Sequence, residues 1–458
     1  MWLHFRELKP KPCKGSENTK WRSHFVFWCY VSNSHYETDF GVYSAKVLEI
    51  VFWKSHRRWD FQKTIFIMRI ADKSYRENSS DSQLRYNCVM INNPFLPQRL
   101  VGRQTELEQI SQILLDDGDL LIAGVAGSGR RTLVKWAAQK AGARVITLDC
   151  LRATDGDRFL KLLAESLLNT FDLPEELLKL QGLLKEQPIS FELTEQSKPR
   201  MVWKLSSTGL WNLFQKLLSL PQQMAEWLDC RVAIVLHNFP HIRSWDRKGE
   251  WEEYLRREIQ LQSRVSYILI ATVPEPWMHK LSLHVVELPP LSNSELCEWL
   301  EPTMQEKGLK FDPQTNALQL FTEYIQGNMS DAIALIRRIW LDYLTLTNSQ
   351  SHSQSEFLVQ PHNVHQNMLV LVEDLAPTFE SLIMLLPPTQ VRVLESLAID
   401  PTVSPHSREY IQKHQLSKGG SLQGALDSLE QKGLVYGAKY GYRIALPTLQ
   451  FWLKQRLG

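Results

Sequence analysis

The chain has 458 residues, of which 43% are apolar and 22% charged, and its formal net charge is +2 at pH 7. This composition is typical of a folded globular protein of two to four domains, and the charge does not favour a general nucleic-acid or membrane binder. The sequence has no run of about 18 apolar residues, so it predicts no transmembrane helix. The N-terminal segment lacks the apolar stretch of a secretory signal, and the six cysteines form no CxxC pair. We expect a cytoplasmic protein.

Residues 1–89 differ from the rest because they hold 17 aromatic residues, against 29 in the remaining 369. Apolar runs at 25–30 and 47–53 favour strands. Four interpretations stay open: an aromatic and basic surface that stacks on single-stranded nucleic acid, a small β domain, a poorly folded segment, or an upstream extension. We favour the last, with translation beginning at Met90, because a self-contained pattern begins directly after that residue.

From residue 90 to 290, predicted strands and helices alternate. Strands are expected at 120–123, 144–149, 232–236 and 266–272. Helices are expected at 104–115, 132–141, 157–187, 210–227 and 246–262, and a hairpin at 189–193 and 201–205. Alternation of this kind predicts an α/β fold, a parallel sheet with helices on its faces.

The last third is predicted to be mainly helical. Residues 291–346 read as a helical lid with a break at Gly327-Asn328, and 347–370 as a linker, since 347–366 are rich in Ser, Gln and His. Residues 371–458 follow with three helices (388–397, 407–414, 420–432) and a hairpin that turns at Gly437. This order is that of an α+β winged helix-turn-helix.

A glycine-rich loop joins the strand at 120–123 to the following helix, and its residues are candidates for phosphate binding: Gly124, Val125, Ala126, Gly127, Ser128, Gly129, Arg130, Arg131 and Thr132. The spacing from Gly124 to Gly129 fits a P-loop, in which backbone N–H groups and a helix N-terminus hold phosphate. The chemical positions depart from that motif. Arg130 stands in place of the phosphate-binding Lys, and Arg131 in place of the Ser or Thr that ligates Mg²⁺. Thr132 is one residue too late to substitute.

The second motif of such a site is also altered. After the apolar strand at 232–236, an Asp that holds Mg²⁺ and an acid that polarises water are expected, but His237 and Asn238 occupy these positions. Neither is anionic at pH 7. Asp149 ends a different strand, which is not the metal-holding strand of this fold, and Asp246 lies nine residues past His237. The same residues argue against Mg²⁺ and against any other resident metal.

From Asn93 onward the sequence resembles the archaeal-type ATPases, signal-transducing (STAND) P-loop proteins close to origin-recognition-type AAA+ proteins. The markers are Asn93-Pro94-Phe95, the glycine loop, VAIVLHNF at 232–239, LPPLS at 288–292 and GNMSDAIAL at 327–335. The resemblance implies a nucleotide-controlled core with a lid and a winged helix, which either binds DNA or packs on the core. Thr272 would be the sensor-like residue after its strand.

The altered motifs favour a pseudo-ATPase that acts as a regulatory or scaffold subunit with a protein partner. Binding of ATP or ADP without metal remains compatible with the loop, unless Arg130 or Arg131 folds onto an acid such as Asp246 and fills the pocket. The alternatives are a nucleotide-binding ATPase of weak activity and a DNA-binding regulator. For DNA, Lys439 and Arg443 of the hairpin are the candidate contacts, because the recognition helix carries Asp427 and Glu430 against a single Lys432.

Overall fold

The computed structural model describes residues 27–38, 41–53, 63–69, 93–194, 198–259, 261–275, 277, 283–348, 357–417 and 419–458. The chain divides into two compact units, Met1–Cys88 and Val89–Gly458. Within the described ranges, no helix combines the length and hydropathy that crossing a bilayer requires.

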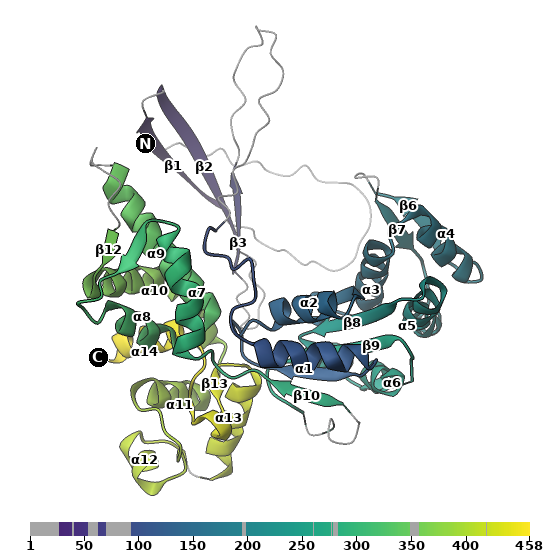
Figure 1. The fold of residues 1–458 in the computed structure, drawn as a ribbon. Coiled ribbons are helices and arrows are strands. Elements are labelled where there is room, and N and C mark those ends of the chain that lie inside the picture. The colour runs from purple at the N-terminus through teal and green to yellow at the C-terminus, as the bar shows by residue number, and fades with distance from the viewer. Residues whose placement is uncertain are drawn as a thin grey trace, which may run out of the picture. The chain divides into compact units, whose positions relative to one another are not determined.

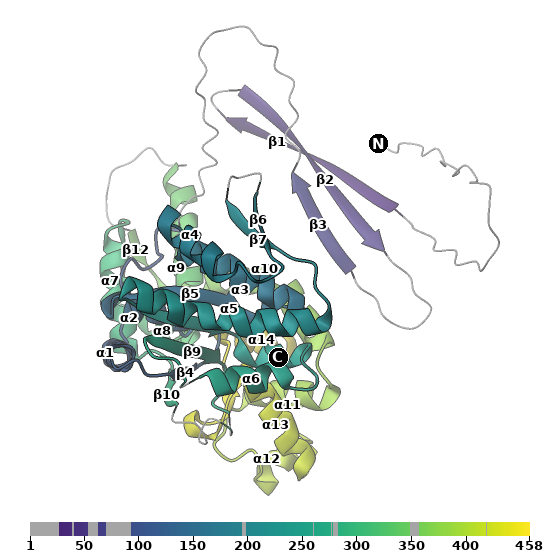
Figure 2. The ribbon, with the colours of Figure 1, turned by 90° about the vertical axis from the view of Figure 1, so that its right-hand side faces the viewer.

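The first unit contains a three-stranded antiparallel sheet, whose order along the sheet follows the chain (Figure 2). Its strands are β1 (Phe27–Thr38), β2 (Gly41–Trp53) and β3 (Lys63–Arg69). The register of β1 and β2 runs from Phe27 paired with Phe52 to Thr38 paired with Gly41. Strands were expected at both apolar runs, and β1 and β2 include most of them. The other hypotheses for residues 1–89 remain predictions, and many of their aromatic residues lie outside the described ranges.

The second unit is built on a parallel five-stranded sheet with the order β10-β4-β9-β8-β5 (Figure 1). Its strands are β4 (Leu120–Ala123), β5 (Ala143–Asp149), β8 (Arg231–His237), β9 (Val265–Ala271) and β10 (His284–Glu287). All four neighbouring pairs are parallel. The carboxyl ends of the strands therefore meet at one edge, where ligands bind in open α/β sheets.

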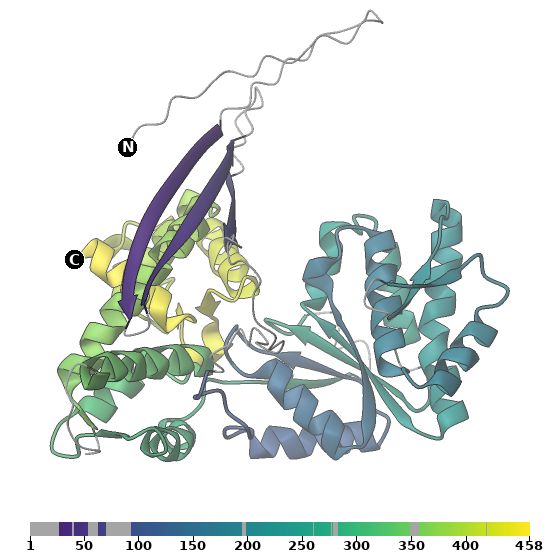
Figure 3. The same ribbon diagram turned by 90° about the horizontal axis from the view of Figure 1, so that it is seen from above.

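Helices cover both faces of this sheet (Figures 1 and 3). Leu120 and Ile122 of β4 pack with α1 (Gln104–Leu115) and α2 (Arg130–Lys140). Leu121 and Ala123 of the same strand belong to the core on the other face. That core includes α3 (Gly156–Thr170), α5 (Ser207–Leu228) and α6 (Glu250–Glu258). Successive side chains of a strand point to opposite faces, so a fully apolar strand supplies two cores. The predicted α/β fold is confirmed.

The helix expected at 157–187 is two helices. α3 ends at Thr170, and α4 runs from Pro174 to Leu183. Pro174 has no backbone N–H and fits best in the first turn of a helix, where it lies in α4, so a new helix begins at this residue. The expected hairpin is confirmed as β6 (Ser190–Leu193) and β7 (Pro199–Val202), an antiparallel pair.

The lid consists of α7 (Asn293–Gln305), β11 (Leu309–Phe311), α8 (Ala317–Ile325) and α9 (Met329–Asn348). The break at Gly327-Asn328 is confirmed, since it separates α8 from α9. The expected linker is wrong for residues 357–370. β12 (Phe357–Val359) pairs with β11, and α10 begins at Pro361 and continues to Met384. The polar composition of this segment did not indicate a helix. The helix is packed through Val364 and Met368, which lie four residues apart and are both buried.

The winged helix has the predicted order. α11 (Pro388–Ile399), α12 (Arg408–Lys413) and α13 (Gly420–Gln431) precede the hairpin of β13 (Val435–Tyr436) and β14 (Arg443–Ile444). A further helix, α14 (Pro447–Leu457), closes the chain. The lid, α10 and the winged helix share one hydrophobic core, to which Phe321, Met368 and Leu453 all belong. The lid and the winged helix therefore form one body.

Candidate phosphate-binding site

The glycine loop follows β4 and leads directly into α2, as the sequence predicts. Gly127 and Gly129 have φ of 84° and 87°, a conformation that glycine adopts without steric cost. Gly129 is also the N-cap of α2. Turns of this kind direct successive backbone N–H groups to one side and make a nest for an anion. The loop therefore keeps the backbone shape of a phosphate site.

The loop is tightly packed at its base. The amide of Gly124 donates to the carbonyl of Ala271 at 3.2 Å, and a Cβ at Gly124 would lie 2.8 Å from Oγ of Ser128. Ser128 is 6% exposed, and its hydroxyl has no hydrogen-bond partner among the described residues. A buried hydroxyl without a partner is unfavourable and is a ready donor for an anion.

Arg130, at the position of the phosphate-binding Lys, is half-buried. Its Nη1 donates to the carbonyl of Ala271 at 2.9 Å. Burial, together with the neighbouring charge of Arg131, lowers the pKa of Arg130. The guanidinium therefore adds positive charge beneath the loop, but it is already bonded to the end of β9. Thr132 is exposed at the start of α2.

Arg131 and Asn238 both bind the carboxylate of Asp149. Nη2 of Arg131 lies 2.7 Å from Oδ2, and Nδ2 of Asn238 donates to Oδ1 at 2.9 Å. The amide of Leu151 also donates to Oδ1, at 3.2 Å. Burial alone would raise the pKa of Asp149, but these hydrogen bonds and the charge of Arg131 outweigh it, so the pKa is lowered. Arg131 and Asn238, which occupy two altered motif positions, thus both donate hydrogen bonds to the carboxylate of Asp149.

His237 pairs with Asp149 in the register of β8 and β5 and is 7% exposed. Its Nδ1 has no hydrogen-bond partner in the described part of the chain. Burial, followed by repulsion from Arg131, lowers the pKa of His237 to about 4. The imidazole is neutral at pH 7 and cannot replace the carboxylate that would hold Mg²⁺. Within the described ranges, no three His, Cys, Asp or Glu side chains are grouped to hold a metal.

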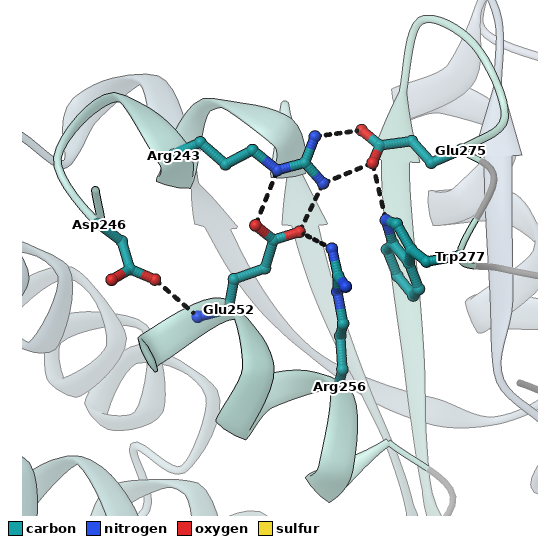
Figure 4. A network of polar contacts seen from close by, with 6 residues as sticks. All are labelled: Arg243, Asp246, Glu252, Arg256, Glu275 and Trp277. Atoms are coloured by element: carbon teal, nitrogen blue, oxygen red, sulfur yellow. Dashed lines mark hydrogen bonds and ion pairs between the residues drawn. The ribbon is translucent and has the colours of Figure 1, made fainter. Parts of the chain in front are cut away.

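Asp246 does not bind the loop arginines, contrary to the alternative considered from the sequence. Its Oδ2 accepts the amide of Glu252 at 2.9 Å. Glu252 in turn accepts from Nε of Arg243 at 2.7 Å and pairs with Arg256 (Figure 4). Arg131 does bind an acid, but the acid is Asp149.

Arg243 connects two segments that leave the carboxyl edge of the sheet. It lies on the 3-10 helix after β8, Phe239–Ser244, and its Nη1 donates to Glu275, after β9, at 3.0 Å. Nε1 of Trp277 donates to Glu275 at 2.7 Å (Figure 4). The hydrogen bonds that Arg243 donates to Glu252 and Glu275 raise its pKa despite its partial burial. This network fixes the segment that follows Thr272.

The winged helix packs beside Thr272 and β10. A Cβ at Gly433 would lie 3.0 Å from Cγ2 of Thr272. Nζ of Lys439 lies 2.8 Å from Oε2 of Glu287 in β10. Arg443 lies over the ring of Tyr436, 5.1 Å from its centroid. The two candidate DNA contacts are thus engaged within the chain, and Thr272 faces the winged helix.

A cavity of about 60 Å³ lies between the winged helix and the loop. Its lining includes Gly124, Thr272, Glu287 and Tyr436. Its volume suits about two water molecules, not a nucleotide.

Sequence reasoning missed Asn328. Its Nδ2 donates to the carbonyl of Ala126 at 3.1 Å, which joins the lid to the glycine loop. The sequence marked Gly327-Asn328 only as a helix break. A helix that starts immediately after an Asn was a signal for a capping role, but not for the contact with the loop.

The comparisons agree with this architecture. The chain is similar to a Walker-type ATPase of Pyrococcus abyssi, with 16% identity and a TM-score of 0.53, over 79% of this chain and 99% of the other. The chain has the fold of a Walker-type ATPase. The family of probable winged helix domains matches residues 377–455 of this ATPase-like chain.

More distant similarity extends to two further archaeal structures. They are the Orc1 protein of Aeropyrum pernix, solved in complex with DNA (15% identity, TM-score 0.41, 79% of this chain and 95% of the other), and Cdc6p of Pyrobaculum aerophilum (14%, 0.38, 80% and 98%). A comparison with the curated proteins finds no match.

Proposed function

We propose that this Walker-type fold is a pseudo-ATPase, which binds a nucleotide phosphate without Mg²⁺ and does not hydrolyse it efficiently. The observation that carries the proposal is the group of contacts that Arg131 and Asn238 make with the carboxylate of Asp149. Asp149 is bound by both residues, which stand at two of the altered motif positions. With its carboxylate engaged in this way, Asp149 is not available to Mg²⁺ or to an attacking water.

Phosphate binding is supported by the features of the P-loop that this chain retains. The positive φ of Gly127 and Gly129 keeps the nest, and α2 presents its N-terminus to it. Arg130 adds a positive charge, and Arg131 adds a second one that Asp149 partly neutralises; both charges favour a phosphate in the absence of metal. ADP and ATP are the ligands that we propose.

The test is a thermal-shift titration with ADP and ATP, with and without Mg²⁺. We expect stabilisation that does not need Mg²⁺, of about 2.7 kcal/mol when the ligand is present at about 100 times its Kd. Gly129→Val should abolish it, because the side chain strains the positive φ at the nest. Gly142→Val is the matched control, since Gly142 has φ of 67° and, like Gly129, open space around its Cβ position. No stabilisation of the wild type by either nucleotide would refute phosphate binding.

Hydrolysis is tested separately. The wild type should release no inorganic phosphate from ATP and Mg²⁺ above the background of Gly129→Val. Clear turnover that Gly129→Val abolishes would favour the alternative, an ATPase of weak activity.

We further propose that the protein is a regulatory or scaffold subunit that acts through a protein partner. A phosphate-binding loop without catalytic groups can still regulate a partner if nucleotide binding changes the conformation of the surface that the partner contacts. The shared core of the lid and winged helix supplies a body large enough to present such a surface.

A further inference from the structure

Residues 326–331, which comprise the turn after α8 and the first three residues of α9, contact both the glycine loop and the C-terminal helix; we refer to them as the turn 326–331. It lies at the start of α9, where the lid approaches the carboxyl edge of the sheet. Asn328 is hydrogen-bonded to the glycine loop, and Gln326 and Asp331 are hydrogen-bonded to α14.

Asn328 holds the glycine loop from the lid. Its Nδ2 donates to the carbonyl of Ala126 at 3.1 Å, while its Oδ1 accepts the amides of Ser330 at 3.1 Å and Asp331 at 3.3 Å. Asn328 is 5% exposed, and a Cβ at Gly127 would collide with its amide. Both ends of the amide are therefore engaged, one by the loop and one by the N-terminus of α9.

Asp331 and Gln326 hold the C-terminal part of the chain. Oδ2 of Asp331 accepts the amide of Thr448, in the first turn of α14, at 3.1 Å. Nε2 of Gln326 donates to Oε1 of Gln450 at 2.8 Å, and Gln450 donates to the carbonyl of Ala398 in α11 at 3.3 Å. The turn is thereby bonded to α14 of the winged helix, and α14 is bonded to α11 of the same domain.

The turn has little room to move by itself. Gly327 has φ of 78°, and a Cβ there would collide with the backbone of Leu291. The amide of Leu291 donates to the carbonyl of Gly327 at 3.1 Å. A displacement at Asn328 is therefore not absorbed locally and is passed on to residues bonded to the same turn.

We propose that Asn328 is a positioning residue of the glycine loop, and that the turn 326–331 transmits the state of the loop to α14 and, through α14, to the rest of the winged helix. The part that concerns a bound ligand rests on the proposed function. The part that concerns the coupling of the two sites does not, because it is a property of the chain without ligand.

The coupling is tested by hydrogen exchange on the full chain without ligand. Asn328→Asp keeps the oxygen that caps α9, but it replaces the donor to Ala126 with a second oxygen. We expect amide exchange in α14 to accelerate by about fivefold to tenfold, the effect of one net hydrogen bond. In the reverse direction, Asp331→Ala should accelerate exchange in the glycine loop, residues 124–129.

Asn363→Ala is the matched control, because Oδ1 of Asn363 accepts the amide of Gln360 at the start of α10 but does not contact the loop. It should change exchange in α10 and leave the loop unchanged. Asn328→Ala serves as a second variant if Asn328→Asp does not fold. Exchange in α14 that stays at the wild-type rate in the folded Asn328 variant would overturn the proposal.

A further exchange experiment with ADP distinguishes this coupling from the proposed phosphate binding. ADP without Mg²⁺ should slow exchange in both the loop and α14 of the wild type, and in the loop alone of Asn328→Ala. Slowing in α14 of Asn328→Ala equal to that of the wild type would contradict transmission through the turn. Failure of ADP to bind the wild type would refute phosphate binding, and the experiment without ligand would still decide the coupling.

Discussion

Asn238 donates a hydrogen bond of 2.9 Å to the carboxylate of Asp149, across the neighbouring strands β8 and β5. In a metal-dependent site the residue after β8 would act on water or metal. Here it serves as a neutral partner for an acid whose other oxygen is bound by Arg131. Both carboxylate oxygens of Asp149 are therefore engaged by side chains of the chain itself.

The first prediction concerns Asp149→Ala. Removing the carboxylate frees Arg131 and deletes a negative charge beside the loop, so the affinity for ADP without Mg²⁺ should rise by about threefold to tenfold. The protein should lose about 1 kcal/mol of stability, because the contacts are partly exposed. Isothermal titration measures the affinity.

Asp155→Ala is its control. Asp155 caps α3 by accepting the amide of Arg158 at 2.8 Å, so its loss has a similar cost in stability but should leave the affinity unchanged. Equal affinities of wild type and Asp149→Ala would contradict our assignment of Arg131.

The second prediction is a pH dependence caused by His237. Because the folded pKa is about 4 and the ordinary value is 6.5, the unfolded chain binds a proton in this window that the folded chain does not. The free energy of unfolding should therefore fall as the pH is lowered from 6.5 to 4. Above pH 6.5, the titration of His237 should not make the free energy of unfolding depend on pH. We expect a difference of about 2 kcal/mol between pH 7 and pH 4, allowing for solvent screening.

Urea denaturation of wild type and His237→Gln at several pH values measures this contribution. Gln does not titrate, so the difference between the two proteins isolates the imidazole. A difference that is constant from pH 7 to pH 4 would show that His237 is not held neutral by burial.

The third prediction concerns the network of Figure 4. Glu252 is 5% exposed and pairs with Arg243 and Arg256. Glu252→Gln leaves two guanidinium groups without their shared anion, so the free energy of unfolding should fall by about 2 kcal/mol. Glu250→Gln, two residues earlier and exposed, should change it by less than about 0.5 kcal/mol. Equal effects of the two substitutions in urea denaturation would contradict the importance of the buried network.

The fourth prediction tests the DNA hypothesis for Lys439. Glu287→Gln removes the partner of Lys439 at a cost of less than about 1 kcal/mol in stability, because the pair is partly exposed. If the hairpin contacts duplex DNA, this variant should bind it more tightly than the wild type. Lys439→Gln should reduce the salt dependence by about one phosphate contact. Affinity that is the same for all three proteins in fluorescence anisotropy would exclude Lys439 as a DNA contact.

Periodicity and glycine spacing were sufficient to predict four of the five strands of the sheet, the loop and the winged helix, because these depend on local patterns. The short edge strand β10 was not predicted. The partner of Arg131 was not predictable in the same way. Asp149 lies 18 residues from Arg131 and 89 from Asn238, and only the order of the strands brings the three together. The sequence suggested Asp246 because it follows the altered motif more closely in the chain.

Long-range contacts also explain the other differences. Lys439 and Arg443 were predicted as candidate DNA contacts, but Lys439 is bound to a strand 152 positions earlier, which no local pattern reveals. The segment 361–370 was interpreted as a linker because its exposed positions are polar. Its helix is stabilised by a few buried residues, such as Val364 and Met368, that contact the lid and winged helix.

The helix α10 also limits how this protein can be divided. A winged helix attached by a flexible tether could be removed, exchanged or recombined with other proteins at small cost. Here a cut near residue 371 would divide a continuous helix and leave Met368, Val372 and Phe379 exposed to water on the two fragments. Neither fragment is then expected to remain soluble alone, so the lid and winged helix should be inherited and exchanged together as one piece.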